Sequence, residues 1–230
     1  MNPPPANPLI VAIDVSDLDE ADRVGAILGP HVGMLKVGLE LLWAAGPEAV
    51  RRVAVYGPVF ADAKLHDIPN TVERASANLA RLGVAMFNVH ALGGEAMMRA
   101  AREGAARGAD AAGVPMPLVI AVTVLSSQSG EGLASPASLA WEAQQAGLDG
   151  VVVSGEDVRD VRDACGDAFV LAVPGIRPPG SNGDDQVRVL TPRAAVERGA
   201  DYLIVGRPVT GADDPVGVLR GMLHDVGHAA

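Results

Sequence analysis

The sequence predicts an α/β fold, a single-domain (β/α)₈ barrel of the TIM type. Short runs rich in Val, Ile and Leu alternate eight times with Ala-rich amphipathic stretches of helical length. Such alternation is typical of parallel strands joined by right-handed helical crossovers. Eight units in 230 residues match the strand count of this barrel and approach its usual size.

The expected strands are short, apolar and mostly followed by a polar residue. In chain order they are Leu9–Asp14, Met34–Val37, Val59–Lys64, Met86–His90, Leu118–Val124, Gly150–Ser154, Phe169–Val173 and Tyr202–Val205. The expected helices are Asp17–Leu28, Pro47–Val55, Val72–Leu82, Glu95–Arg107, Pro136–Ala146, Glu156–Cys165, Pro192–Arg198 and Pro215–Leu223. Several helices begin with Pro, which needs no N–H partner in the first turn, and several end before a Gly.

An open, doubly wound sheet is the alternative arrangement of these elements. That fold often carries a glycine fingerprint after its first strand, whereas Asp14–Asp17 contains no glycine. The barrel is therefore favoured. Residues 1–8 are Pro-rich and predicted to form a loose tail, and residues 9–230 are expected to form one domain. The stretches Ser126–Ser135 and Pro174–Leu190 are interpreted as loops over the barrel mouth.

Composition argues against several classes of partner. A net charge of −10 gives no general attraction for nucleic acid or an anionic membrane, and aromatic residues at 3% leave few platforms for stacking bases. No basic-then-apolar leader and no apolar run of about 18 residues is found. The single cysteine, Cys165, allows no internal disulfide. We expect a cytoplasmic protein that binds neither nucleic acid nor membrane.

The third expected strand carries charged residues that indicate chemistry. Asp62 and Lys64 are two residues apart and therefore project from the same face of the strand. The second strand supplies Lys36 at the same height, the first ends in Asp14, and the loop Asp67–Thr71 follows the third. Catalytic residues of (β/α)₈ barrels gather at the C-terminal ends of strands. This convergence predicts an active site in which carboxylates keep a lysine protonated and the lysine donates a proton.

The last two strands predict a phosphate-binding site. The eighth strand leads into Gly206 and Arg207, which offer a backbone N–H and a guanidinium group together. Barrels often bind phosphate with the loops that follow strands seven and eight. The seventh loop, Pro174–Pro178, leads to Gln186, a further candidate donor.

Simpler interpretations exist for these residues and for others. The charged cluster could be a structural set of ion pairs, and Arg207 a surface salt bridge. His90 is expected at the top of the fourth strand as a hydrogen-bonded structural histidine, because no recognised zinc-ligand spacing joins it to other residues. Trp43 and Trp141 are expected to pack on helix faces.

Taken together, these segments resemble the orotidine 5′-phosphate decarboxylase family. The segment Asp62–Thr71, which reads DAKLHDIPNT, is similar to the family's signature. Further similar segments follow in the family's order: Ile13-Asp14, Leu35–Gly38, Asn88–His90, Thr123–Ser127, Pro174–Pro178 and Gly206–Thr210. The resemblance covers the chain from Leu9 to about Leu219.

The resemblance implies an enzyme that converts orotidine 5′-phosphate into uridine 5′-monophosphate and carbon dioxide, the last step of that nucleotide's synthesis. It also implies catalysis without a metal or organic cofactor, in a homodimer whose active sites are shared. By position, Lys36, Asp62, Lys64 and Asp67 would form the charged catalytic array, with Asp67 donated by the partner chain. Lys64 would protonate C6 of the pyrimidine as carbon dioxide departs.

The resemblance also implies a set of substrate contacts. Asp14 and Lys36 would hold ribose hydroxyls, with Asp67 and Thr71 reaching across from the other subunit. Ser126 or Ser127 would contact the base; the family often has threonine in place of Ser126. The remaining residues implied to bind substrate are Ile68, Pro174, Arg177, Gln186, Gly206 and Arg207, of which the last four would line the phosphate end.

Two other functions remain as alternatives. A related barrel decarboxylase or aldolase acts on a phosphorylated sugar acid, depends on magnesium and shares the Asp-x-Lys-x-x-Asp pattern. The segments Ile68–Thr71 and Pro174–Pro178 favour the nucleotide enzyme instead. A nucleotide-binding barrel without catalysis would normally have a broken charged array, whereas every member is present here.

Overall fold

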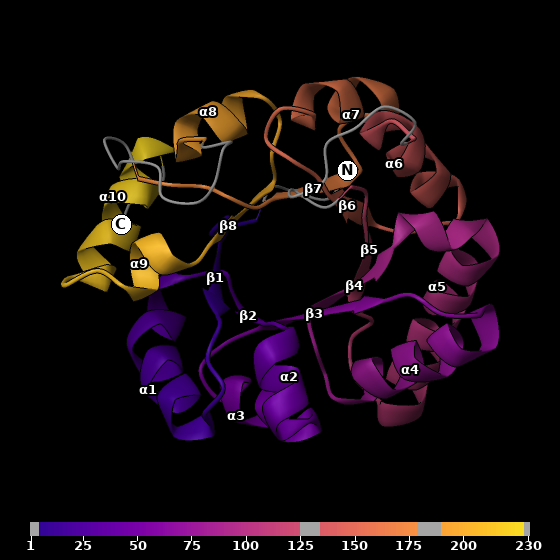
Figure 1. Ribbon diagram of the computed structural model, residues 1–230, viewed down its shortest axis with the longest axis horizontal. Coiled ribbons are helices and arrows are strands. Elements are labelled where there is room, and N and C mark those ends of the chain that lie inside the picture. The colour runs from indigo at the N-terminus through magenta and orange to yellow at the C-terminus, as the bar shows by residue number, and fades with distance from the viewer. Residues whose placement is uncertain (1–4, 125–133, 179–189, 228–230) are drawn as a thin grey trace.

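Eight parallel strands close into a barrel in the computed structural model, which describes residues 5–124, 134–178 and 190–227. Each strand pairs with the next along the chain, and β8 pairs with β1. The strands are β1 (Leu9–Ile13), β2 (Met34–Val37), β3 (Val59–Leu65), β4 (Met86–His90), β5 (Leu118–Val122), β6 (Gly150–Val152), β7 (Val170–Val173) and β8 (Tyr202–Val205). The predicted (β/α)₈ barrel is confirmed (Figure 1).

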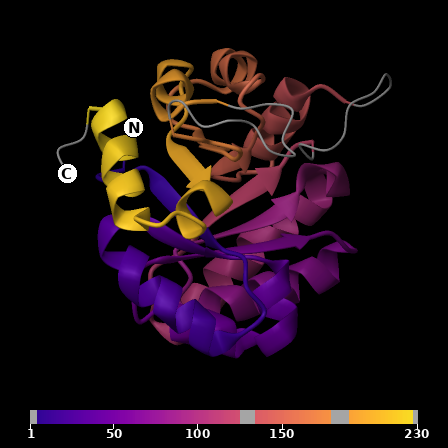
Figure 2. The same cartoon turned by 60° about the vertical axis from the view of Figure 1, so that its left-hand side comes forward.

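Helices form a ring outside the strands (Figures 1 and 2). They are α1 (Leu18–Leu28), α2 (Leu39–Ala45), α3 (Pro47–Val53), α4 (Pro69–Arg81), α5 (Gly94–Ala112), α6 (Pro136–Gln145), α7 (Val158–Cys165), α8 (Pro192–Glu197), α9 (Arg207–Thr210) and α10 (Pro215–Asp225), with the 3₁₀ turns η1 (Gly29–His31) and η2 (Ala91–Gly93). The last helix, α10, contacts the first, α1, which completes the ring. No helix of the described residues is long and apolar enough to cross a membrane.

The structure corrects two expectations about helices. The short helices α2 and α9 were not expected. Helix α4 begins at Pro69 rather than Val72, so Thr71 lies in its first turn and not in a loop. Proline at the first helical position is preorganised for a helix start, and the sequence already offered that signal.

The strands alternate between two apolar cores. One lies inside the barrel and is built by large side chains from successive strands, among them Ile10, Met34, Phe60, Met86 and Ile120. The other lies between the strands and the helices and contains the intervening residues of the same strands. This period of two is the side-chain alternation of a β-strand. The inner core fills the barrel below the site, so the site rests on a packed floor.

Both tryptophans correct the expectation of helix-face packing. The exposed fraction of Trp43 in α2 is 86%, and that of Trp141 in α6 is 52%. Three further large apolar residues are exposed just after neighbouring strands: Leu39 after β2, Ile68 after β3 and Leu92 after β4. Since the C-terminal ends of neighbouring parallel strands lie at one end of a barrel, Leu39, Ile68 and Leu92 lie at that end, and Trp43 follows Leu39 by about one turn of α2. We refer to Leu39, Trp43, Ile68 and Leu92 as the apolar rim.

Candidate active site

The barrel places a polar layer directly above its apolar floor. On β2, β3 and β4 a buried apolar residue is followed two positions later by a buried polar one. The polar residues are Lys36, Asp62 and Asn88, and their exposed fractions are 8%, 9% and 1%. Because residues two apart share a face of a strand, all three side chains point into the barrel toward its C-terminal end.

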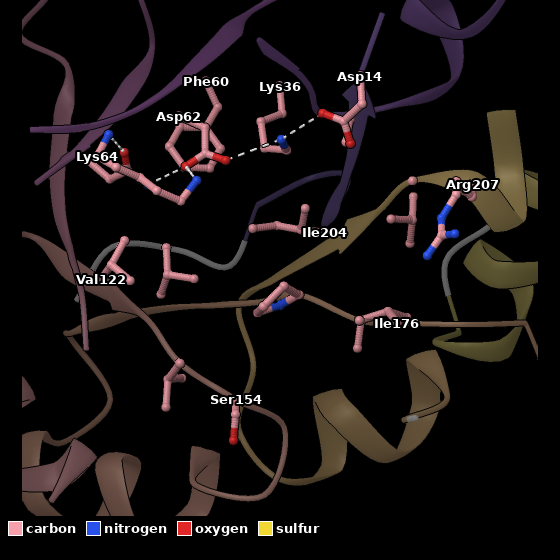
Figure 3. A pocket seen from close by; sticks show the side chains of 18 of the residues that line it. Asp14, Lys36, Phe60, Asp62, Lys64, Val122, Ser154, Ile176, Ile204 and Arg207 are labelled. Atoms are coloured by element: carbon pink, nitrogen blue, oxygen red, sulfur yellow. Dashed lines mark hydrogen bonds and ion pairs between the residues drawn. The ribbon is translucent and has the colours of Figure 1, made fainter. Parts of the chain in front are cut away.

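Four charged side chains form a continuous row across this layer (Figure 3). Lys36 Nζ lies 3.2 Å from Asp14 Oδ1 and 3.2 Å from Asp62 Oδ2. Lys64 Nζ lies 2.5 Å from the other oxygen of Asp62, Oδ1. The signs alternate along the row, and each cation contacts at least one carboxylate. The array predicted from the sequence is therefore assembled within one chain, except for Asp67.

The surroundings of Asp62 favour its ionised form. Burial by itself raises the pKa of this carboxyl. The charges of Lys36 and Lys64, with hydrogen bonds from Lys64 and Asn88, outweigh burial and hold the pKa of Asp62 below its ordinary value of 3.8. Asp62 is thus a carboxylate at neutral pH. A second negative group beside Asp62 would be repelled by it, unless Lys36 and Lys64 also contacted that second group.

Lysine occurs nowhere else in the chain. The sequence contains two lysines, Lys36 and Lys64, and 16 arginines make up the remaining basic residues, because Lys and Arg total 18. Both lysines belong to the charged row. Arginine holds its proton at all ordinary pH values, whereas lysine can release one. The distribution therefore places lysine only at this site.

Asn88 is a buried member of the network that the sequence analysis did not assign to the site. Its Nδ2 donates to Asp62 Oδ1 at 2.7 Å, and its Oδ1 accepts from the backbone N–H of Lys64 at 2.7 Å. A signal was available: Asn88 follows the inward Met86 by two residues, and a buried amide requires partners.

A cavity of about 360 Å³ opens beside the charged row. Its lining includes the four residues of the row and, from the segments that follow β7 and β8, Pro174, Arg177, Gly206 and Arg207. Arg207 lies beyond Asp14, at the far end of the row from Lys64 (Figure 3). Arg177 is 6% exposed, and its Nε has no hydrogen-bond partner among the described residues. The cavity thus presents Lys64 toward one end and the guanidinium of Arg207 toward the other (Figure 3).

Three predicted site residues lie outside this cavity in the single chain. Asp67, Ile68 and Thr71 are exposed and do not line it. The Asp67 carboxylate accepts a hydrogen bond from the Ile68 N–H at 2.7 Å. Three others, Ser126, Ser127 and Gln186, lie outside the described residues.

The histidines near the site correct one further expectation. His90 is half-buried, and its ring packs against that of His66 with centroids 5.4 Å apart. Among the described residues the His90 ring has this contact and no hydrogen bond. Burial lowers the pKa of His90, and His66 and Lys64 act in the same direction. No group of three or more His, Cys, Asp or Glu side chains in the described part of the chain could hold a metal ion.

Comparisons with known proteins identify the relatives of this chain. Residues 7–222 match the model of the orotidine 5′-phosphate decarboxylase / HUMPS family. The chain is 48% identical to an orotidine 5′-phosphate decarboxylase from Moorella thermoacetica, with 95% of this chain and 91% of that protein covered. It is also 48% identical to one from Nitratidesulfovibrio vulgaris, with 95% and 97% covered. The crystal structure of orotidine 5′-phosphate decarboxylase from Lactobacillus acidophilus is similar, with a TM-score of 0.83, 34% identity, and 96% and 99% covered.

Proposed function

The chain belongs to the orotidine 5′-phosphate decarboxylase / HUMPS family, and from this premise we propose how its residues carry out the reaction. The enzyme is a carbon–carbon lyase that releases carbon dioxide from orotidine 5′-phosphate and leaves uridine 5′-monophosphate, within pyrimidine nucleotide synthesis. The observation that carries the proposal is the row of Asp14, Lys36, Asp62 and Lys64 beside a cavity with Arg177 and Arg207.

Lys64 supplies the proton that the reaction consumes. The bond between C6 of the pyrimidine and its carboxylate carbon breaks, carbon dioxide leaves, and the electron pair stays on C6. This pair lies in the ring plane and cannot delocalise into the ring. A proton moves from the Lys64 ammonium to C6, which gives the product and a neutral amine that water reprotonates. Preorganised charge near C6 stabilises the developing carbanion, which is electrostatic catalysis without a metal or organic cofactor.

Lys36 and Asp62 hold the donor and the substrate in place. Asp62 binds both lysines through separate oxygens, at 3.2 Å from Lys36 and 2.5 Å from Lys64. Lys36 with Asp14 is suited to ribose hydroxyls, because an ammonium donates and a carboxylate accepts. Asp62 also faces the substrate carboxylate, which disfavours the bound ground state.

The phosphate occupies the other end of the cavity. Arg207 and Arg177 match phosphate oxygens by charge and by their fork of N–H groups, and Pro174 and Gly206 complete the lining with backbone. Gln186 adds a further donor there, and Ser126 or Ser127 contacts the base. Binding energy from the phosphate, far from C6, can then be used at the reacting carbon.

The active site is completed by a second copy of the chain. Asp67, Ile68 and Thr71 are exposed and lie outside the cavity of their own subunit. Ile68 belongs to the apolar rim of Leu39, Trp43, Ile68 and Leu92, and exposed apolar patches are typical of association surfaces. In a two-fold dimer this rim is buried, and Asp67 with Thr71 reaches the ribose in the partner's site.

An absorbance assay tests the function and the role of Lys64 together. The purified protein is expected to remove the absorbance of orotidine 5′-phosphate, and Lys64→Ala to lose nearly all turnover, about 10⁴-fold or more, because the proton donor is gone. Lys64→Ala should still bind uridine 5′-monophosphate, since the phosphate and ribose contacts remain. Binding of this product and circular dichroism serve as the controls for folding.

Two results would contradict the proposal. Near-normal turnover by a folded Lys64→Ala protein would exclude Lys64 as the donor. Loss of wild-type turnover on addition of a chelator would favour the magnesium-dependent sugar-acid enzyme, which the comparisons do not favour.

A further inference from the structure

We infer that Asn88 is a positioning residue that fixes the backbone of Lys64 and the carboxylate of Asp62 through the two ends of one buried amide. Asn88 contacts these two residues of the array and acts on the substrate only through them. The inference rests on the proposed function in one respect, which is that Lys64 is the group whose position matters for turnover.

The first observation is an interruption of the barrel at the site. Ala61 pairs with Phe87 and Leu65 pairs with Val89, so β3 advances four residues while β4 advances two. The regular ladder of backbone hydrogen bonds between β3 and β4 is broken over this interval, which contains Asp62 and Lys64. Such irregularities redirect side chains next to active sites.

The second observation is the backbone of Lys64 itself. Its φ is +47°. In the described part of the chain, every other residue with a positive φ is a glycine. A side chain with a Cβ adopts this left-handed conformation only where its surroundings hold it there. Some contact must therefore compensate for the lost ladder at this residue.

Asn88 supplies that contact. It lies between the paired residues Phe87 and Val89, opposite the interruption, and its Oδ1 accepts from the Lys64 N–H at 2.7 Å. The Asn88 side chain thus replaces a backbone acceptor of the ladder. Asn88 is only 1% exposed, so solvent water cannot easily take its place as the acceptor for the Lys64 N–H.

The other end of the same amide restrains Asp62. Asn88 Nδ2 donates to Asp62 Oδ1 at 2.7 Å, and that oxygen also accepts from Lys64 Nζ at 2.5 Å. Lys64 is therefore held at two points: its backbone N–H by Asn88 directly, and its ammonium by Asp62, which Asn88 orients. One amide that donates at one end and accepts at the other can serve both points, whereas alanine, leucine or a carboxylate cannot.

Two variants and one control test the inference. Asn88→Ala removes both contacts. Asn88→Asp keeps the shape and the acceptor for the Lys64 N–H but replaces the donor to Asp62 by a carboxyl group. Thr123→Val is the matched control, because Thr123 is 1% exposed on the next strand and donates to the Val152 carbonyl at 3.0 Å without lining the cavity.

For Asn88→Ala we expect kcat to fall about 10- to 100-fold, the loss typical of a displaced catalytic group, with affinity for uridine 5′-monophosphate changed less than about threefold. Thr123→Val should lower stability but leave kcat unchanged. A purely structural role for Asn88 predicts that the two variants behave alike. A kcat for folded Asn88→Ala within about twofold of wild type would overturn the inference.

The pH dependence of Asn88→Asp gives a second, independent readout. The titratable and charged groups that face Asp62 are Lys36 from β2, Lys64 from β3 and His90 from β4. Beside Asp62 the introduced carboxyl should protonate readily, since like charges in a buried place raise a pKa. Its protonated form can again donate to Asp62. The ratio of variant to wild-type kcat should therefore rise as the pH falls, and a ratio that is flat with pH would overturn the inference even if Asn88→Ala fails to fold.

Selective labelling separates this inference from the proposed function. Because the chain contains two lysines, protein labelled at lysine Cε gives two side-chain NMR signals. In the absence of substrate, Asn88→Ala should shift or broaden the Lys64 signal, assigned with Lys64→Ala, and Thr123→Val should leave it in place. An unmoved Lys64 signal would overturn the positioning role, whether or not the wild-type protein decarboxylates orotidine 5′-phosphate.

Discussion

At the scale of single residues, the two arginines of the cavity differ in burial and so in what they can contribute. Arg177 is 6% exposed within the cavity wall, whereas Arg207 is an exposed residue at its edge. Because Arg207 is exposed, a phosphate that enters the cavity from solvent can reach its guanidinium. A charge-assisted hydrogen bond of this kind contributes about 1.5 to 3 kcal/mol.

We therefore predict that Arg207→Ala lowers kcat/KM for orotidine 5′-phosphate by about 10- to 100-fold, the factor equivalent to that energy. The same variant should change the weak turnover of orotidine, which lacks the phosphate, very little. Steady-state kinetics with both substrates measure the difference. The matched control is Arg193→Ala, which removes a surface arginine that pairs with Asp225 on α10. Equal loss with both substrates would show that Arg207 serves another purpose.

At this scale the sequence predicted the charged row, because spacing of two on a strand is a local rule. Asp62 and Lys64 were expected on one face, and they contact each other at 2.5 Å. The positive φ of Lys64 could not be predicted, because it depends on the interrupted pairing between β3 and β4. The spacing of Asn88 from Met86 indicated an inward polar residue, but its partners on β3 become evident only when the two strands lie side by side.

At the scale of elements, α4 and α5 pack so closely that glycine is required between them. A Cβ built on Gly104 would lie 2.1 Å from the Glu73 carbonyl oxygen, and one on Gly108 would lie 2.2 Å from that of Ala77. Both contacts are with backbone of α4, which cannot move aside as a flexible side chain would. The shortest approach of the two helices therefore lies along these glycines.

This packing reverses the usual effect of replacing glycine by alanine in a helix. Alanine is favoured over glycine by about 1 kcal/mol in a helix interior. We predict that Gly108→Ala nevertheless destabilises the protein, by about 1 to 3 kcal/mol, because the added methyl forces α4 and α5 apart. The matched control is Gly221→Ala in α10, where an added Cβ meets nothing within 4 Å. Gly221→Ala should stabilise by about 0.5 to 1 kcal/mol. Urea unfolding measures both, and a gain of stability in Gly108→Ala would contradict the packing argument.

Strands and helices could be predicted from the sequence wherever their apolar and polar residues alternate with a regular period. All eight strands and eight of the ten helices, all except α2 and α9, lie where alternation of apolar and polar residues indicated. Helix α2 was missed because Leu39–Ala45 reads LELLWAA, which is apolar on nearly every side and therefore shows no amphipathic period. Helix α9 has four residues and was read as part of a loop. Short helices are set by the chain around them more than by their own sequence.

At the scale of the whole molecule, the cavity of the single chain holds only part of the predicted array. Its cavity contains Lys36, Asp62 and Lys64, but Asp67 and Thr71 lie outside it. The two tryptophans were expected to pack within the chain, and Trp43 is instead 86% exposed on the apolar rim. A sequence pattern marks a side chain as apolar but does not state whether its own chain or a second copy covers it.

Subunit exchange tests whether the site is shared. Lys64→Ala and Asp67→Ala should each be almost inactive alone, because every site then lacks one member of the array. In a mixed dimer with Asp67 acting across the interface, one site carries both mutations and the other carries neither. With random exchange half of the dimers are mixed, so a quarter of all sites are native and activity should return to about a quarter of wild type.

The same experiment excludes the unshared arrangement. If Lys64 and Asp67 served the same subunit's site, each site of a mixed dimer would carry one mutation and no activity would return. Exchange is verified separately by mixing subunits that carry different affinity tags and recovering both from one column. Trp43→Asp is the companion variant, because the proposed dimer would bury the apolar rim. A charge there should split that dimer, and the resulting monomer, without a partner's Asp67, should lose turnover while its barrel stays folded. Verified exchange without recovery of activity would exclude the shared site, and an active Trp43→Asp monomer would show that one chain is sufficient for catalysis.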